Sequence, residues 1–217
     1  FHPENRASHA ELLRAMRAAH RERFGSTDDL LVGLQITHSG RYSRPEEDFR
    51  PRPRIAYRHP LLDGRSGVED DSAVLTDAEL EEVIGDFVLH AKFAQEAGFD
   101  FVDVKQCHGY LLHEMLSAHT RPGRYGGSFE NRTRLFREIV EGVRRDAPGL
   151  LIGTRISVFD AVPYQKAASD PMGSGEPVRH LHLLPYRYGF GVDPMRPTEP
   201  DLTEPLMLLG LCEQLGV

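Results

Sequence analysis

Hydrophobic residues recur along the chain in two patterns, and the two patterns alternate. Over residues 80–94 apolar side chains return every three or four positions, which predicts an amphipathic helix. Thr76 and Glu79 have the spacing of a capping box in front of this helix, and Gly98 is placed to end it. Comparable spacing predicts helices over residues 5–23, 131–145 and 203–215 and a helical turn over 111–117.

Three short runs of nearly continuous apolar residues lie between these helices, at residues 30–36, 99–104 and 150–156. The first run is typical of a strand that is buried on both faces, as in a parallel sheet. Strands that alternate with helices predict right-handed βαβ units and therefore an α/β fold. No G-x-G-x-x-G motif follows any strand, so a (β/α)8 TIM barrel is favoured over a nucleotide-binding Rossmann fold.

Only three βα units are visible in the 217 residues, whereas a TIM barrel closes with eight. We therefore expect residues 1–217 to be a central fragment of one barrel domain, and the lack of an initial Met agrees with this. Residues 41–75 and 158–200 are long, irregular insertions rich in Pro or Arg. Each is expected to be either a cover over the active face or a solvated loop.

The charge balance narrows the function classes. There are 26 basic and 33 acidic residues, giving a net charge of −7, which argues against a general binder of nucleic acid or anionic membranes. No apolar run is long enough to span a bilayer, and the polar first residues are unlike a signal peptide. Two cysteines, Cys107 and Cys212, cannot form a disulfide framework, so a reducing, cytoplasmic setting fits best. The oligomeric state stays open, a homo-oligomer included.

Each predicted strand is followed by polar or ionisable side chains, and in a barrel these strand ends share the face that carries the active site. Gln35 offers a donor and an acceptor that suit the edge of a heterocycle such as a flavin pyrimidine, or it satisfies a backbone group. Arg155 could oppose an anion or an electron-rich ring, or pair with Asp103 or Asp160.

The second strand end carries the strongest candidate chemistry. Lys105 or His108 could donate a hydrogen bond to a carbonyl oxygen on which charge develops, and the Tyr110 hydroxyl could deliver a proton. Alternatively, Lys105 pairs with a carboxylate and Tyr110 only packs. A metal site is not favoured, because His38, His108, His113 and His119 lack a two-histidine helix motif and nearby carboxylates.

At this point the sequence resembles the old yellow enzyme family of flavin-dependent reductases, which includes NADH:flavin oxidoreductases and 2,4-dienoyl-CoA reductases. The resemblance covers about residues 1–160 and places the three strands as the third to fifth of the barrel. The segments that carry it, in order, are Val32–Tyr42 with Q-x-x-H-x-G-R, Gly98–Val104, the H-G-Y-L segment of His108–Ser117, the Y-G-G-S-x-E-N-R segment of Tyr125–Arg132, and Ile152–Ser157.

This resemblance implies an FMN-binding barrel in which Gln35 and Arg155 contact the cofactor. It also implies that His108, with the residue at position 105, binds a substrate carbonyl and that Tyr110 donates a proton. The reaction would pass hydride from NADH or NADPH through flavin to an activated, carbonyl-conjugated alkene. Many members of the family carry His at the position of Lys105, so the usual enone specificity does not follow directly.

Two other hypotheses stay open. One is a Schiff-base lyase or aldolase barrel that uses Lys105 as the nucleophile. The other is a non-catalytic remnant that binds a partner. The sequence shows no iron–sulfur motif and does not reveal the physiological substrate.

Overall fold

The structure is a computed structural model and describes residues 5–167, 172–173 and 175–217. Its main elements are α1 (Arg6–Phe24), β1 (Gly33–Ile36), α3 (Asp77–Ala97), β2 (Phe101–Gln106), α4 (Leu111–Leu116), α5 (Phe129–Asp146), β3 (Leu151–Ile156) and α6 (Thr203–Leu215). Shorter elements are η2 (Gly40–Tyr42), α2 (Asp63–Ser66), η3 (Asp71–Ala73), β4 (Tyr164–Gln165), β5 (Glu176–Pro177) and η4 (Leu181–Leu183).

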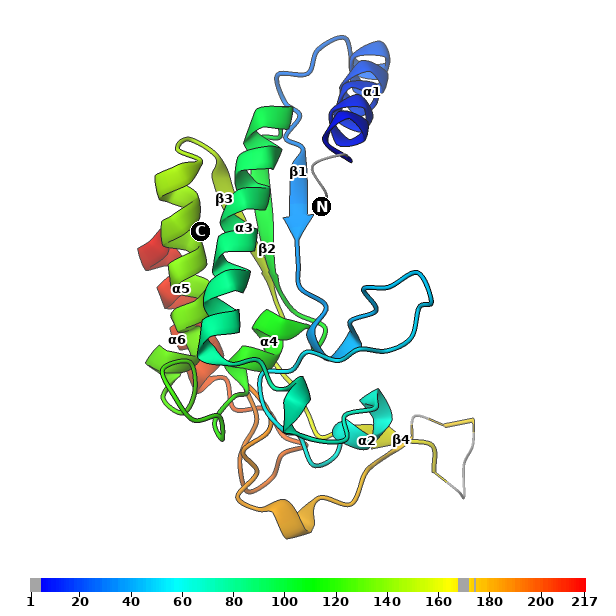
Figure 1. Cartoon of the computed structure of the whole chain (residues 1–217), viewed down its shortest axis with the longest axis vertical. Helices are drawn as coiled ribbons and strands as arrows, with labels where there is room; N and C mark the ends of the chain where they lie inside the picture. Colours follow the sequence, from blue (N-terminus) through cyan, green and yellow to red (C-terminus); the bar gives the residue numbers. More distant parts are fainter. Residues whose placement is uncertain (1–4, 168–171, 174) are drawn as a thin grey trace.

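The main sheet is parallel, with the strand order β1-β2-β3. Helices α3 and α5 connect these strands and cover one face of the sheet (Figure 1). The predicted α/β class and the alternation of strands and helices are therefore confirmed. A closed barrel is not formed within the described residues, in which the parallel sheet has three strands.

The predicted start and end signals of α3 are confirmed. The Thr76 hydroxyl accepts from the Glu79 amide at 3.2 Å, and the Glu79 carboxylate accepts from the Thr76 amide at 2.8 Å, which completes the capping box of α3. Gly98 ends α3 with φ 94°, a left-handed conformation that glycine adopts without strain. None of the helices in the described ranges is long and apolar enough to cross a membrane.

The core lies between the sheet and its helices. Val102 and Val104 of β2 are fully buried, as are Leu80 and Ala91 of α3 and Ile139 of α5. Alternate residues of a strand point to opposite faces of the sheet. Asp103 and Lys105 therefore lie on the face that α3 and α5 do not cover.

The prediction that the first strand is buried on both faces is wrong. The strand begins at Gly33 rather than at Leu30, and Gln35 is exposed while its neighbour Ile36 is buried. The physical reason is the single helical layer: apolar residues of β1 pack against α3, and within the described residues no comparable layer covers the other face.

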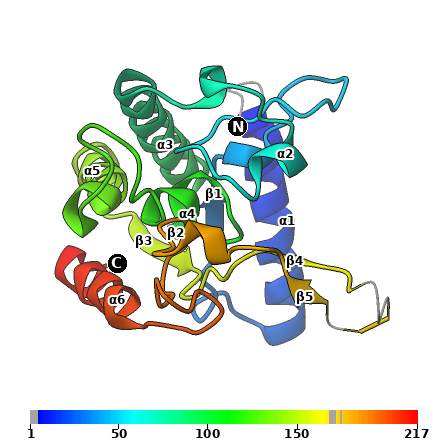
Figure 2. The ribbon, with the colours of Figure 1, turned by 90° about the horizontal axis from the view of Figure 1, so that it is seen from below.

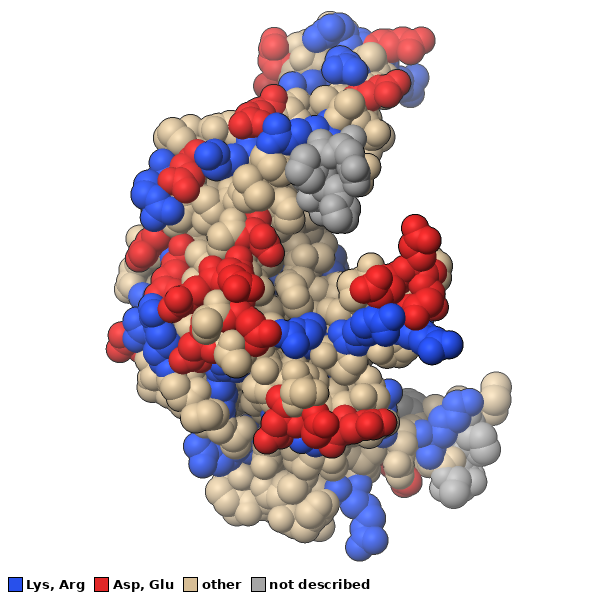
Figure 3. All heavy atoms as spheres, viewed as in Figure 1, with Lys and Arg blue, Asp and Glu red and all other residues tan. Residues whose placement is uncertain are grey.

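The two long insertions lie at the carboxyl-terminal ends of the strands (Figures 1 and 2). Viewed from that end, η4 passes in front of the main sheet, and β4 and β5 lie to one side of it, in front of α1 (Figure 2). Residues 168–171 and 174 of the second insertion lie outside the described residues. The space-filling view shows a hollow beside β1, with α1 above it and the loop after η2 below it (Figure 3).

A buried arginine joins the loops that follow β1 and β2. Arg41 of η2 is 2% exposed, and its Nε donates to Glu114 of α4 at 2.9 Å. Its Nη1 donates to Asp63 of α2 at 2.6 Å, and its Nη2 donates to the Tyr57 carbonyl at 3.2 Å. Burial raises the pKa of Glu114 to about 7, against the opposing effect of Arg41. This carboxyl therefore depends on Arg41 to stay ionised.

The structure also explains why glycine precedes this arginine. Gly40 has φ 57°, and a Cβ placed on it would lie 2.8 Å from the backbone nitrogen of Leu111. That nitrogen donates to the His38 carbonyl at 3.1 Å. The turn after β1 and the start of α4 are thus in backbone contact, and a side chain at position 40 would separate them.

We expect Arg41→Met to lower the free energy of unfolding by about 3–5 kcal/mol, because it leaves the Glu114 carboxyl buried without its cation and removes one of the two arginines that pair with Asp63. The measurement is chemical denaturation of the purified protein at pH 7.5. Arg50→Met is the matched control, since Arg50 is 80% exposed and lies 3.8 Å from Asp48; its expected loss is below about 1 kcal/mol. Equal losses in the two variants would contradict this role of the buried network.

Candidate functional site

The candidate residues of the three strands lie in two rows on the face of the sheet that α3 and α5 leave uncovered. In the first row Gln35 of β1 is in register with Asp103 of β2. In the second row Lys105 of β2 is in register with Arg155 of β3. The parallel register therefore brings together side chains that are 120 residues apart in the sequence, and the predicted common face is confirmed for these strand residues.

Gln35 makes a side-chain contact that the sequence analysis did not anticipate. Its Nε2 donates to Asp103 Oδ2 at 2.6 Å, which leaves its carbonyl oxygen free to accept a hydrogen bond. The other carboxylate oxygen, Asp103 Oδ1, is buried without a partner in the structure. Gln35 thus presents one acceptor oxygen, and it also lines a cavity of about 330 Å³ between α1 and β1. The alternation of residues along β1 and β2 indicates that both side chains lie on one face of the sheet, but it does not indicate that they pair.

Arg155 does not form the carboxylate pair that was one of the arrangements expected for it. Its side chain is exposed, and among the described residues it forms no ion pair with Asp103 or Asp160. Arg155 is exposed because no described layer covers this face of the sheet. Gly153 precedes it on that face, in register with Asp103, and the nearest atom to a Cβ placed there is 3.9 Å away. The surface between the Gln35–Asp103 pair and Arg155 is therefore open.

The segment after β2 turns sharply. His108 and Gly109 both have positive φ angles, 63° and 69°, a conformation that is strained for histidine. The His108 amide donates to the Ser157 hydroxyl at 3.3 Å, and the Gly109 amide donates to His113 Nδ1 at 2.8 Å. These contacts hold the turn against β3 and α4, and they leave the His108 side chain exposed.

The turn brings Tyr110 back over the end of β2. The Lys105 ammonium lies 3.9 Å from the centroid of the Tyr110 ring, and Lys105 is only 8% exposed. Tyr42 lies on the other loop, with its ring centroid 6.1 Å from that of Tyr110. The structure thus places Lys105 at the end of β2 and His108 and Tyr110 in the turn that follows it. It adds Tyr42, which the sequence analysis did not single out as a site residue.

Other residues of the characteristic segments have structural contacts. Tyr125 is fully buried and its hydroxyl donates to Glu138 at 2.7 Å. Asn131 donates to the Gly126 carbonyl at 3.1 Å, and Arg132 donates to the Gly127 carbonyl at 2.9 Å. His38 Nδ1 accepts from the Gly40 amide at 3.0 Å. These residues shape the loops and the start of α5 rather than the open surface.

Comparison with known proteins places this geometry in a family. The family model described as NADH:flavin oxidoreductase / NADH oxidase matches residues 6–181. The chain belongs to this family. A curated relative, the NADPH dehydrogenase of Bacillus velezensis, is 37% identical over 131 residues, which are 59% of this chain and 36% of that protein.

Solved structures agree with the family. The Old Yellow Enzyme from Pichia sp. AKU4542 is 28% identical with a TM-score of 0.51, over 71% of this chain and 39% of that one. Morphinone reductase in complex with tetrahydroNAD is 25% identical with a TM-score of 0.56, over 73% of this chain and 45% of that one. The predicted family and the TIM-barrel fold class are confirmed, and nothing in these findings supports a Schiff-base lyase.

The chain is shorter than its relatives. It spans 53% of a putative 12-oxophytodienoate reductase-like protein of Arabidopsis thaliana and 33% of an NADPH dehydrogenase of Clostridium acetobutylicum. It spans 36% of the NADPH dehydrogenase of Bacillus velezensis and 35% of 12-oxophytodienoate reductase 1 of Oryza sativa subsp. japonica. The uncovered face of the three-stranded sheet is consistent with that coverage, because eight strands are needed to enclose a barrel interior.

In this member of the NADH:flavin oxidoreductase family, the two insertions pack on each other. The Tyr57 hydroxyl donates to the Tyr188 carbonyl at 3.2 Å, and the two rings stack with centroids 6.4 Å apart. His59 is 3% exposed, and its ring centroid lies 6.4 Å from that of Tyr186 and 5.5 Å from that of Tyr188. The insertions are therefore joined by an aromatic cluster, and the described parts are not independent solvated loops.

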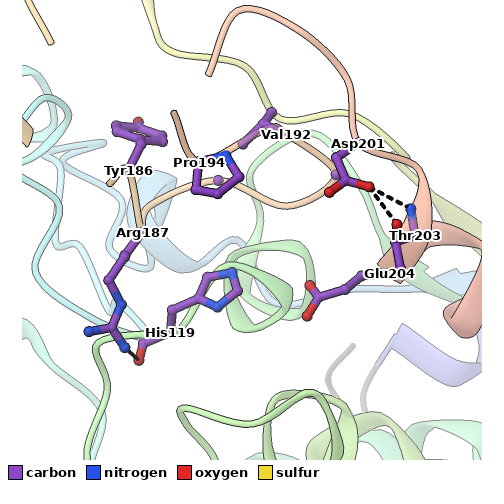
Figure 4. A pocket seen from close by; sticks show the side chains of 10 residues that line it. His119, Tyr186, Arg187, Val192, Pro194, Asp201, Thr203 and Glu204 are labelled. Atoms are coloured by element: carbon purple, nitrogen blue, oxygen red, sulfur yellow. Dashed lines mark hydrogen bonds between the residues drawn. The ribbon is translucent and has the colours of Figure 1, made fainter. Parts of the chain in front are cut away.

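A cavity of about 320 Å³ lies behind the second insertion (Figure 4). His119 and Glu204 point into it, and Asp201 accepts from the Thr203 hydroxyl at 2.6 Å. Burial and the charge of Arg132 lower the pKa of His119 to about 4. None of the candidate residues of the strands or of the 105–110 turn lines this cavity, so it is separate from the surface described above.

We expect the stability of the protein to fall as the pH is lowered from 6.5 to 4, in part through His59. Burial, with a smaller contribution from Arg41, lowers the pKa of His59 to about 4. An unfolded histidine takes up its proton near pH 6.5, so the folded state loses up to about 3 kcal/mol relative to the unfolded state across this window. Above pH 6.5 His59 is neutral in both the folded and the unfolded state, so none of this stability is lost.

His59→Asn should flatten the curve of unfolding free energy against pH over that window. In the structure the Leu61 and Leu62 amides donate to His59 Nδ1 at 3.1 and 3.2 Å. The side-chain oxygen of asparagine can still accept these hydrogen bonds. The control is His182→Asn at an exposed position of η4, which should leave the curve unchanged. A curve for His59→Asn that keeps the original slope would refute the assignment.

Proposed function

We propose that this chain is part of an FMN-dependent oxidoreductase that passes hydride from NADH or NADPH to an activated, carbonyl-conjugated alkene. The observation that carries the proposal is the register of the sheet. It places Gln35 and Arg155, an amide and a guanidinium suited to a flavin, on the same face as Lys105 and the Tyr110 turn. Family membership supports the same reaction class.

The residues present fit FMN. A flavin pyrimidine edge carries one N–H donor and two carbonyl acceptors. The Gln35 carbonyl oxygen can accept from that N–H, and Arg155, which is unpaired in the part of the chain that the structure describes, can donate to a carbonyl oxygen. Gln35 and Arg155 would hold the cofactor, and the positive charge of Arg155 would favour its reduced, anionic state.

FMN, when bound, supplies the transfer of hydride from NAD(P)H to the β-carbon of the alkene. The chain's own residues then act on the substrate. His108, with an exposed side chain, would bind the substrate carbonyl oxygen. Tyr110 would give its hydroxyl proton to the α-carbon. A relative named 12-oxophytodienoate reductase 1, from Oryza sativa, supports a carbonyl-containing substrate.

We also propose the wider setting of the chain. Residues 1–217 would form a central part of one barrel domain, and the insertions 41–75 and 158–200 would line the entrance to its active face. The substrate would be a small molecule rather than a nucleic acid or a membrane. Two buried free cysteines, Cys107 and Cys212, favour a reducing cytoplasmic location. A homo-oligomer is compatible with this proposal.

The full-length protein should show the visible absorbance of bound flavin. Gln35→Ala and Arg155→Ala should each weaken FMN binding about tenfold, since each removes hydrogen bonds to the cofactor. Titration of the apoprotein with FMN, followed by fluorescence quenching, measures this. Arg14→Ala on the exposed face of α1 is the control and should bind FMN normally. A protein that binds no FMN, even when it is added in excess, would refute the proposed function.

Tyr110→Phe should slow the reduction of an α,β-unsaturated ketone about 100-fold, because a positioned general acid contributes at least that factor. KM should change little, since the ring that contacts Lys105 is kept. Steady-state assays with NADPH and 2-cyclohexenone measure both parameters. Tyr164→Phe, at a half-exposed position of β4, is the control. Unchanged activity in Tyr110→Phe would favour a non-catalytic role of this turn.

A further inference from the structure

The surroundings of Lys105 are unusual for a charged side chain. It is 8% exposed, yet within the described residues it forms no ion pair and no hydrogen bond. Its ammonium lies instead against the face of the Tyr110 ring, 3.9 Å from the centroid. A cation at this distance is attracted by the negative face of an aromatic ring. Among the described residues, the Tyr110 ring is thus the main partner of the Lys105 ammonium.

The backbone holds this contact in place. The positive φ angles of His108 and Gly109 turn the chain so that Tyr110 returns to Lys105, five residues earlier. The Tyr110 amide donates to the Cys107 carbonyl at 3.3 Å, and the Gly109 amide is fixed by His113. Tyr42 occupies the neighbouring position, where a Cβ on Gly109 would lie 3.4 Å from its ring. Tyr110 has little freedom to leave the ammonium.

We propose that Lys105 acts in the reaction through Tyr110, by keeping a positive charge at the ring while Tyr110 gives up its proton. This inference rests on the proposed function. The Tyr110 O–H bond breaks and a C–H bond forms at the α-carbon, with the electron pair supplied by the enolate that remains after hydride addition. Negative charge then spreads from the phenolic oxygen into the ring, and water later returns the proton.

The position of the ammonium suits this role. A partly buried charge interacts more strongly than one in water, because the surrounding dielectric constant is lower. The ammonium is attracted to the neutral ring and still more strongly to the charged one, so its contribution is larger in the transition state than before it. Lys105 is therefore a positioning residue that favours proton transfer, rather than a direct ligand of the substrate or a Schiff-base nucleophile.

The test is a double-mutant cycle in the FMN-bound, full-length protein, with rapid-mixing measurement of the two half-reactions. Lys105→Met keeps the length of the side chain and removes its charge. It should slow reoxidation by 2-cyclohexenone about tenfold, leave reduction by NADPH unchanged, and keep the half-saturating enone concentration within about twofold. In a Tyr110→Phe background the same substitution should have no further effect. Lys92→Met, on the exposed side of α3, is the control.

Three outcomes would overturn the inference. Equal losses with and without the Tyr110 hydroxyl would show that Lys105 acts independently of it. A large rise in the half-saturating enone concentration with an unchanged maximal rate would make Lys105 a ligand of the substrate carbonyl. A borohydride-trapped adduct on Lys105 would make it a nucleophile. Absence of bound flavin, or of enone turnover in the unsubstituted protein, refutes the proposed function instead.

A second readout does not depend on the reaction. The chain has only three lysines, so the Hε signals of 13C-lysine-labelled protein can be assigned by substitution. The Lys105 signal should be shifted upfield by the Tyr110 ring, should stay shifted in Tyr110→Phe, and should return toward the usual position in Tyr110→Leu. An unshifted Lys105 signal in the unsubstituted protein would contradict the contact itself, even if the protein is an active flavoenzyme.

Discussion

The relative position of the two strand-end loops depends on the guanidinium of Arg41. It comes from the turn after β1, and it contacts α4 through Glu114, α2 through Asp63 and the first insertion through the Tyr57 carbonyl. The second oxygen of Glu114 accepts from the Ala56 amide at 3.1 Å. One buried cation thereby fixes the segments around the Tyr110 turn. It does so without contacting the candidate residues on the open face of the sheet. Without it, the Glu114 carboxyl would stay buried and unpaired and Asp63 would keep only Arg58, so the arrangement is cooperative.

The sheet imposes the second constraint. Parallel pairing fixes which residues of β1, β2 and β3 lie side by side, and a shift by one residue would turn Gln35, Lys105 and Arg155 toward the helices. The buried valines on the opposite face of β2 prevent such a shift, because their burial against α3 and α5 would be lost. The hydrophobic core and the candidate site are therefore two consequences of the same register.

These two constraints show what could be predicted from the sequence. Apolar periodicity and the Thr76–Glu79 capping box are local signals, and they located α3 and the alternation of strands with helices. Strand-end position identified Gln35, Lys105 and Arg155. Burial could not be predicted from a local run of apolar residues, since it depends on what covers each face. The Gln35–Asp103 contact and the aromatic cluster of the insertions also join distant segments, and no spacing in the sequence indicates such pairs.

Lys105 and Arg155 differ in burial, and this difference also depends on what covers each side chain. Both lie on the uncovered face and are in register, yet Arg155 is exposed while Lys105 is buried. No described segment covers the Arg155 side chain. Lys105 is covered by Tyr110, a residue of its own turn. The lysine–tyrosine unit is therefore assembled by local backbone geometry, and its contact does not require the remainder of a barrel to form.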